Sequence, residues 1–214
     1  MTRDFEIKVW GEVDHTLIHV CLNNEIVIFP YLIIFISHLP LQYDSSIALK
    51  KDANICVDVR NPLSDEIREK VVIDPSELIE DENSKEPPYH FGLTWEGSKK
   101  KSVMTVLDVD GVKSALKKSG KKGKKAKSDA NDPRIPRPFT ANDKSFVPIL
   151  ALECRGIEPI AFYPMGGEFI IESEAGAVFD GDDVDFSEGD WADYDTENDI
   201  SVSAYEFKSK FESI

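Results

Sequence analysis

Short runs of branched and aromatic residues recur along this chain and predict strands. In the run FEIKVW, Phe5, Ile7 and Val9 would share one face of a strand, with polar or mixed residues between them. Similar runs lie at Ile55–Val59, Glu69–Ile73, Ser102–Val109, Val147–Glu153, Gly167–Glu172 and Ser201–Phe211. In the last run the apolar positions change parity between Ala204 and Tyr205, which predicts a bulge. The pattern predicts a mainly β protein.

Residues 14–37, DHTLIHVCLNNEIVIFPYLIIFIS, do not fit this pattern. The apolar stretch from Ile26 to Ile36 contains Pro30 and is shorter than the roughly 20 residues that a membrane-spanning helix needs. Three interpretations stay open: a hydrophobic hairpin or helix packed on the domain, a membrane-touching segment, and a translated intron. Composition supports the intron, because Ile, Asn, Phe, Tyr and Leu dominate and the codon of Val13 would supply a donor GT. No membrane contact is expected unless the segment is genuine and exposed.

A second unusual segment, residues 111–142, separates two strand-rich regions. From Lys113 to Lys127 its charged residues are all basic, and SDANDPRIPRPF follows. Because such a sequence has little apolar surface to bury, it predicts a flexible lysine-rich loop. The chain then divides into an amino-terminal β half at 1–110 and a carboxy-terminal β half at 143–214, each sandwich-like or barrel-like.

Charge is distributed unevenly along the chain. The formal net charge is −15, which disfavours binding to nucleic acid or anionic membranes. The lysine-rich segment nevertheless offers a basic patch, either a nuclear-import signal or a phosphate-binding arm. It lacks the interleaved aromatic residues of single-strand binders, and it would also suit a weak, salt-dependent contact with the acidic tail. The candidate residues are Lys117, Lys118, Lys121, Lys122, Lys124 and Lys125.

Cysteine usage and the first residues indicate an intracellular protein, cytoplasmic or nuclear. The three cysteines, Cys21, Cys56 and Cys154, are odd in number and widely spaced, which does not suggest a disulfide framework. The start of the chain lacks the basic-then-apolar order of a secretory signal. Cys154 is the candidate for an enzymatic thiol. In a strand, however, Arg155 would face away from it while Leu152 shares its side, so a core role is favoured.

Three carboxy-terminal stretches carry a family resemblance. LECRGIEPIAFYP, DVDFSEGDWADYD and SVSAYEFKSKFES resemble the carboxy-terminal half of the CXXC-motif-containing zinc-binding proteins, a eukaryotic family with little assigned function. The resemblance covers residues 147–212. The amino-terminal half is similar more loosely, through HLPLQYDSS, VDVRNPLSDEIREKVVIDPSE and FGLTWEGSKKKSVMTV.

The resemblance implies a lost zinc site. Family members carry two C-x-x-C pairs, which suit a tetrahedral Cys₄ zinc site. The first pair falls on Asn61 and Ser64 and the second on Trp95 and Ser98, so none of the four positions offers a thiolate. The expected cofactor is therefore none. Two readings of Trp95 stay open: its indole fills the former site with apolar area, or it lies on an exposed turn that has drifted.

The acidic segment EGDWADYD admits a cation site, but DGDDVDFSEGD does not keep the spacing of a calcium loop. A solvated acidic loop with its two aromatic residues packed beneath it is the favoured structural reading. The functional alternative is a partner-binding surface of Asp190, Trp191, Asp193, Tyr194 and Asp195. The histidines and glycines form no recognisable catalytic motif. The sequence therefore predicts a non-enzymatic binding or scaffold protein with an unknown protein partner; the alternative is a nuclear or nucleic-acid adaptor acting through the lysine-rich loop.

Overall fold

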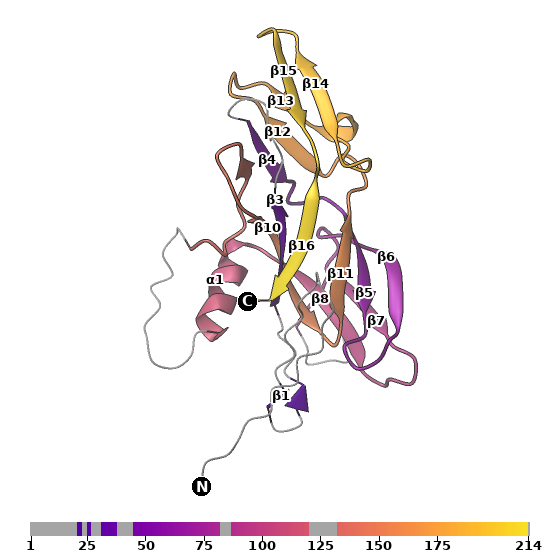
Figure 1. The fold of residues 1–214 in the computed structure, drawn as a ribbon. Coiled ribbons are helices and arrows are strands. Elements are labelled where there is room, and N and C mark those ends of the chain that lie inside the picture. The colour runs from indigo at the N-terminus through magenta and orange to yellow at the C-terminus, as the bar shows by residue number, and fades with distance from the viewer. Residues whose placement is uncertain are drawn as a thin grey trace.

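The structure is a computed structural model that describes residues 21–22, 25–26, 31–37, 45–81, 87–119 and 132–213. Strands dominate it, as predicted, and the one helix in this part of the chain is α1, Val109–Ser119 (Figure 1). The amino-terminal strands are β1 Cys21–Leu22, β2 Glu25–Ile26, β3 Tyr31–Ser37, β4 Ser46–Leu49, β5 Ile55–Arg60, β6 Ile67–Ile73, β7 Phe91–Thr94 and β8 Lys101–Leu107. After α1 come β9 Phe139–Thr140, β10 Val147–Arg155, β11 Glu158–Tyr163, β12 Phe169–Glu172, β13 Val178–Phe179, the 3₁₀ turn Gly181–Asp183, β14 Trp191–Asp195, β15 Ile200–Ala204 and β16 Lys208–Ser213.

Antiparallel pairing organises these strands into sheets. The largest has the strand order β16-β3-β10-β8-β7, and two others have the orders β11-β5-β6 and β13-β12-β4-β9. The pairs β14-β15 and β1-β2 form two-stranded sheets. In Figure 1 the hairpin β14-β15 lies at one end of the molecule, and β5, β6, β7 and β8 lie near the other.

The strands before and after the lysine-rich segment are interleaved rather than separated into two halves. The long strand β10 pairs with β8 on one side and with β3 on the other. Likewise β11 pairs with β5, and β12 pairs with β4. The predicted division into two β halves therefore describes the order of the sequence but not the assembly of the sheets, because each larger sheet combines strands from both sides.

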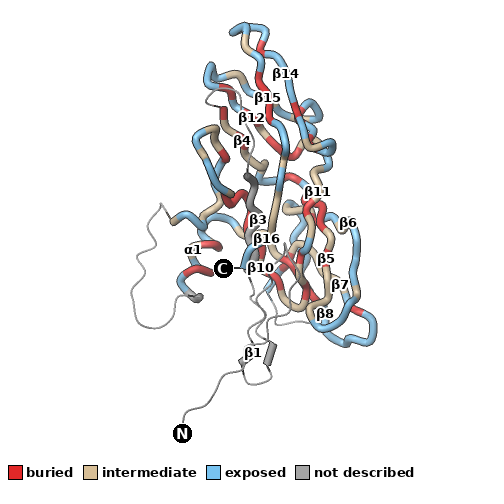
Figure 2. Tube along the Cα trace, in the orientation of Figure 1, coloured by how far each residue is buried: buried red, intermediate tan, exposed pale blue. Residues whose placement is uncertain are grey.

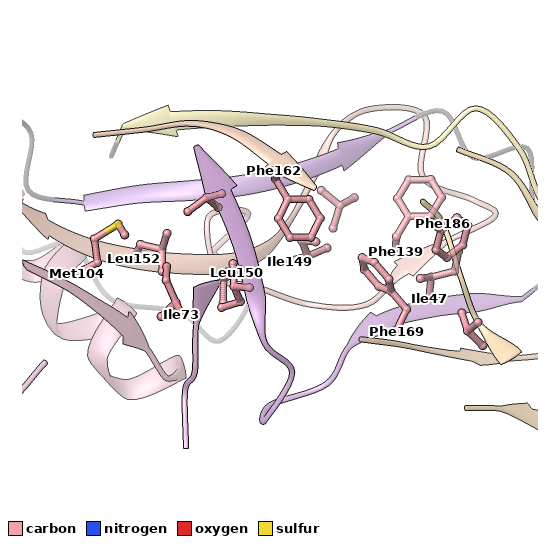
Figure 3. Close-up of a cluster of buried hydrophobic side chains, with 14 of the residues drawn as sticks. Ile47, Ile73, Met104, Phe139, Ile149, Leu150, Leu152, Phe162, Phe169 and Phe186 are labelled. Carbon is pink, nitrogen blue, oxygen red and sulfur yellow. The ribbon is translucent and has the colours of Figure 1, made fainter. Parts of the chain in front are cut away.

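One large apolar core lies between the sheets, in a sandwich-like arrangement. Figure 2 shows its buried residues concentrated along the inner strands. In Figure 3, Met104 and Leu152 lie towards one end of this cluster, and Phe169 and Phe186 lie towards the other, with their rings edge to face. Aromatic pairs favour this geometry, and burying such large side chains supplies the main favourable free energy of folding.

The start of the predicted loop is a helix, which corrects its expected boundaries. Val112, Ala115 and Leu116 lie three or four positions apart and are buried, so α1 presents an apolar stripe to the sheet. Val112 and Leu116 pack with Ala151, on the face of β10 opposite the main core. The far part of the loop is also ordered by the core, since Phe139 is buried. Residues 120–131 lie outside the described residues.

The doubtful segment contributes a strand. Tyr31–Ser37 is β3, which pairs with both β10 and β16 and so occupies an interior position of the largest sheet. The three interpretations of residues 14–37 stay predictions, since residues 14–20, 23–24 and 27–30 lie outside the described residues. The predicted first strand FEIKVW lies outside the described residues. Within the described part of the chain, no helix has the length and apolar content needed to cross a membrane.

The predicted bulge after Ala204 is instead a break between two strands. β15 ends at Ala204, and β16 begins at Lys208 in a different sheet. Between them Glu206 has a positive φ of 57° and its N–H donates to the carboxylate of Asp190 at 2.7 Å. A change of sheet thus restores the core-facing side, where the sequence pattern alone suggested a bulge.

Candidate functional site

The two tetrapeptides that the family resemblance aligns with C-x-x-C pairs, residues 61–64 and 95–98, form turns of the same kind. The N–H of Ser64 donates to the carbonyl of Asn61 at 3.3 Å, in the connection between β5 and β6. The N–H of Ser98 donates to the carbonyl of Trp95 at 3.0 Å, in the connection between β7 and β8. In the second turn Gly97 has φ 72°, which glycine tolerates without strain. Each pair of positions therefore lies at the ends of one tight turn.

A carboxylate joins the two turns. The N–H of Glu96, inside the second turn, donates to Oε2 of Glu66 at 3.0 Å. The other oxygen, Oε1, lies 2.7 Å from Nη2 of Arg68. Glu66 lies two residues after Ser64, and its own N–H donates to Oγ of Ser64 at 3.3 Å. The fold thus brings together two segments that are 30 residues apart in sequence.

The side chains at these positions do not fit a tetrahedral zinc centre. Oδ1 of Asn61 accepts the N–H of Leu63 at 3.0 Å, and Oγ of Ser64 accepts that of Glu66. Oγ of Ser98 accepts the N–H of Lys100 at 3.1 Å. These oxygens stabilise the turns locally, and neither a thiolate nor an imidazole accompanies them. Among the described residues, no group of three or more His, Cys, Asp or Glu side chains is placed to hold a metal ion.

Trp95 is the one member of the four that is buried, with 3% of its surface exposed. Its ring belongs to the main core, and Nε1–H donates to the carbonyl oxygen of Gly156 at 2.7 Å. A buried indole N–H needs such a partner. The reading of Trp95 as an exposed, drifted turn residue is therefore wrong: the indole ties the β7–β8 turn to the β10–β11 turn.

Known proteins resemble this chain over the region that contains the two turns. The family described as "CXXC motif containing zinc binding protein, eukaryotic" matches residues 44–212, which is most of the chain. The chain belongs to this family. The matched region contains both turns and the ECRGIEP and DWADYD segments, so the resemblance noted in the sequence is confirmed.

Individual relatives agree with the family assignment. A UPF0587 protein of Drosophila melanogaster is 47% identical over 75 residues, 35% of this chain and 45% of that protein. The human CXXC motif containing zinc binding protein is 38% identical over 76 residues, 35% of this chain and 46% of its own length. Each alignment thus spans less than half of the relative. A solved hypothetical protein from Plasmodium falciparum shares the fold, with a TM-score of 0.65, 19% identity and coverage of 85% of this chain and 99% of that one.

The acidic segment proves to be a strand of a hairpin rather than a loop. Trp191 is buried, with Nε1–H donating to the carbonyl of Asp183 at 2.7 Å. Asp195 is also buried and accepts the N–H of Glu197 at 3.0 Å, which stabilises the hairpin turn.

Two further members of that segment bear on the predicted partner surface. Tyr194 is exposed, contrary to the expectation that it packs beneath the segment, and its hydroxyl donates to Asp199. Asp193 is exposed too and accepts the N–H of Tyr194 at 2.7 Å. Of the five predicted residues, only Asp190, Asp193 and Tyr194 therefore present side chains at the surface.

Cys56 and Cys154 are free and buried. Cys154 is buried in the core between β3 and β8, opposite Met104. Burial, together with the charges of Glu153 and Glu158, raises the pKa of its thiol. Cys56 is buried as well, and burial followed by the charge of Asp58 raises its pKa. A raised pKa leaves the unreactive thiol at neutral pH, which agrees with a core role for Cys154.

The predicted basic patch is described only at its beginning. Lys117 is exposed on α1, and Lys118 lies in the same helix. The remaining lysines of the patch, at 121, 122, 124 and 125, lie outside the described residues. Sequence reasoning did not identify Glu66 as the link between the turns, because a surface glutamate carries no signal of a backbone partner 30 residues away.

Proposed function

We propose that the protein is a non-enzymatic binding or scaffold protein that keeps the family fold without the family zinc. The observation that carries this proposal is the position of Trp95. Its indole is buried at a position where the resemblance implies a family ligand, and its N–H donates to the carbonyl of Gly156. The side chain therefore ties two turns together by packing and a hydrogen bond, in the region where the resemblance places a metal.

The surroundings of the two turns support folding without metal. A structural zinc contributes on the order of 10 kcal/mol to small zinc domains that have little other core. Here both turns connect strands that pack on a large apolar core, and Glu66 joins them through the N–H of Glu96. The turns accordingly have sources of stability that an isolated zinc finger lacks.

A non-enzymatic role is supported by the state of the thiols. Cys56 and Cys154 are buried and have raised pKa values, so neither is prepared for nucleophilic attack. The exposed part of the acidic hairpin, with Asp193 and Tyr194, supplies a surface for a protein partner. Aromatic side chains of this kind are enriched where proteins meet.

The deciding experiment is the zinc content of the full-length protein, purified without chelators and measured by elemental analysis. We expect no stoichiometric zinc, and a thermal unfolding curve that does not change when a chelator is added. A matched positive control is the variant with cysteine at positions 61, 64, 95 and 98. One tightly held zinc per chain in the natural sequence would overturn the proposal.

A second function, a nuclear or nucleic-acid adaptor, is favoured by the anchoring of α1. Val112 and Leu116 fix this helix to the sheet, so the lysine-rich segment starts from a defined place on the surface. Substituting glutamine for the four lysines at 121, 122, 124 and 125 leaves α1 intact. If the adaptor function holds, the natural protein binds a fluorescent single-stranded oligonucleotide at low salt and the variant does not. Absence of binding at low salt would exclude it.

A further inference from the structure

A cavity of about 810 Å³ lies between β4, the end of β8, the start of α1 and the Pro136–Pro138 segment. Its volume is in the range of about 300 to 1,000 Å³ that is typical of small-molecule sites. Apolar side chains from three strands line much of it: Ala48, Leu49, Val106, Leu107, Ile149 and Leu150. The last two belong to the main core and are labelled in Figure 3. The cavity therefore offers an apolar wall that is continuous with the interior.

The charged groups around this wall are of both signs. Lys50, Lys51 and Arg137 line the cavity, against two acidic residues, Asp108 and Asp110. Over the whole chain the balance is reversed, with 25 basic and 40 acidic residues. Two of the three basic residues are neutralised by ion pairs outside the lining, so the preference for an anionic group at this place rests on Lys51.

The two carboxylates are already engaged. Oδ1 of Asp108 accepts the N–H of Gly111 at 2.7 Å, which caps the first turn of α1. Oδ1 of Asp110 lies 3.4 Å from Nζ of Lys113, one turn further along the helix. Neither acidic group is therefore directed solely at the cavity.

Among the three basic residues, Lys51 is the one that can receive a ligand. Lys50 pairs with Asp180, and Arg137 lies 2.6 Å from Asp143. Lys51 is exposed and has no ion pair with any residue that the structure describes. A long side chain with a free ammonium group can close over an anion while its methylene groups cover the apolar wall.

His90 adds a neutral polar group to the lining. Its Nδ1 accepts the N–H of Val106 at 3.0 Å, so the proton of the neutral ring is on Nε2. Burial lowers the pKa of His90, although the nearby charge of Asp74 opposes the shift. The ring is accordingly a hydrogen-bond donor at neutral pH and contributes no acceptor that would repel an anion.

We propose that this cavity binds a small organic carboxylate with an apolar body. The body packs against Leu49, Val106 and Leu107, and the carboxylate pairs with the ammonium group of Lys51. No bond is made or broken. This site goes beyond the proposed scaffold function and does not depend on whether zinc is present, because the two turns at positions 61–64 and 95–98 do not line it.

The test uses the full-length protein and two probes. The first is 8-anilinonaphthalene-1-sulfonate, a fluorescent anion with an apolar body, and the second is decanoate, which is expected to displace it. We expect saturable binding of the fluorescent probe with a stoichiometry of one. Decanol, which has the same body without the charge, is expected to compete about tenfold less well, a difference of about 1.4 kcal/mol.

Two variants locate the binding. Val109→Asp introduces a negative charge into the cavity lining at a half-exposed position, where aspartate also suits the first turn of the helix. Lys51→Glu reverses the charge of the group that would pair with the carboxylate. Lys99→Glu is the matched control, since it makes the same charge change at an exposed position outside the lining.

We expect each cavity variant to weaken decanoate binding by about tenfold or more, and the control to leave it unchanged. Circular dichroism confirms that each variant is folded. The proposal is overturned by the absence of saturable binding, by equal effects of Lys51→Glu and Lys99→Glu, or by decanol competing as well as decanoate. If Val109→Asp fails to fold, the comparison of decanoate binding by Lys51→Glu and Lys99→Glu still tests the proposal.

Discussion

The hydroxyl of Ser102 lies against the Cα atom of Gly156, so that a Cβ atom at position 156 would stand 2.7 Å from Oγ of Ser102. Gly156 also has φ 68° and offers its carbonyl to the indole of Trp95. This turn is therefore restricted in two ways, by its backbone conformation and by the space beside it. The glycine of the ECRGIEP segment is required for steric reasons.

Gly156→Ala is expected to destabilise the protein by about 2 kcal/mol or more, because left-handed backbone strain costs roughly 1–2 kcal/mol and the contact with Ser102 adds to it. The matched control is Gly97→Ala, which has φ 72° but no heavy atom within 4 Å of the added methyl group. Urea unfolding compares the two. In a Ser102→Ala background the cost at position 156 should fall towards that of the control; an unchanged cost would show that the contact does not matter.

Trp95→Phe tests the hydrogen bond to Gly156 separately from the packing of the ring. The variant keeps an aromatic side chain but leaves the carbonyl without its indole donor, at a cost of about 1–3 kcal/mol. Trp95→Ala also creates a cavity and should cost about 3–5 kcal/mol. Unfolding is followed by circular dichroism, because the fluorescence of tryptophan changes with the substitution.

A second tryptophan provides the control for this prediction. Trp191→Phe removes an equivalent bond, to the carbonyl of Asp183 at 2.7 Å. Hydrogen exchange should accelerate in the turn at residues 156–157 for Trp95→Phe only. Equal exchange in both variants would mean that the Trp95 bond does not hold the β10–β11 turn in place.

Runs of branched and aromatic residues predicted some of the strands, although their burial is not a simple alternation: β10 is buried on both faces, and in β6 only Ile73 is buried. These runs identified β5, β6, β8, β10 and β12 to within a few residues. Pairing could not be predicted in this way: nothing local shows that β10 has β8 on one side and β3 on the other. The helix α1 was missed because Val112, Ala115 and Leu116, which face the sheet, are interspersed with lysines and run into the lysine-rich segment.

The sequence identified the residues of the candidate site but not which of them are buried or what they contact. The family resemblance singled out Asn61 with Ser64 and Trp95 with Ser98, and the structure places each pair on a turn and joins the two turns. Whether Trp95 is buried depends on the carbonyl of Gly156, which is 61 residues away in sequence. A hydrogen bond between residues so far apart in sequence produces no periodic pattern of apolar and polar residues.

Restoring cysteine at all four positions tests whether the two turns are still placed as a pair of metal-binding knuckles. The variant Asn61→Cys, Ser64→Cys, Trp95→Cys, Ser98→Cys is expected to bind one zinc per chain, detected by elemental analysis and by the absorption of its cobalt complex. Four thiolates on two tight turns suit tetrahedral coordination. The control retains Ser98 and should bind more weakly; a quadruple variant that is folded by circular dichroism but binds no zinc would show that the turns are not correctly placed.

Cys154 and Cys56 should be inert in the folded protein. Both are buried and have pKa values raised by burial, so the thiolate is scarce at pH 8 and a reagent has no access. The measurement is the rate of labelling by Ellman's reagent in a Cys21→Ser background, which removes the third cysteine. We expect two thiols to react in urea and none within minutes under native conditions. Rapid native labelling at either position would contradict the packing and reopen a nucleophilic role.

Glu168 is expected to make stability depend on pH. Its side chain is buried: Oε1 accepts the N–H of Met165 at 2.9 Å, while Oε2 has no hydrogen-bond partner among the described residues. Burial raises the pKa of this carboxyl group in the folded protein, and the charge of Asp185 adds to the shift. Between the unfolded and folded pKa values the native state binds more protons, so its stability decreases as the pH rises through that window.

Glu168→Gln removes this titration while keeping the shape and the acceptor for Met165. At pH 7 the variant should be more stable than the natural protein because it does not place an ionised carboxylate in the interior; each unit by which burial raises the pKa corresponds to about 1.4 kcal/mol. The difference should shrink as the pH falls towards the unfolded pKa of glutamate, about 4.3, where both side chains are neutral. Glu172→Gln, on the same strand but exposed, is the control and should show no such trend. A stability difference that stays constant with pH would mean that Glu168 does not change its protonation state on folding.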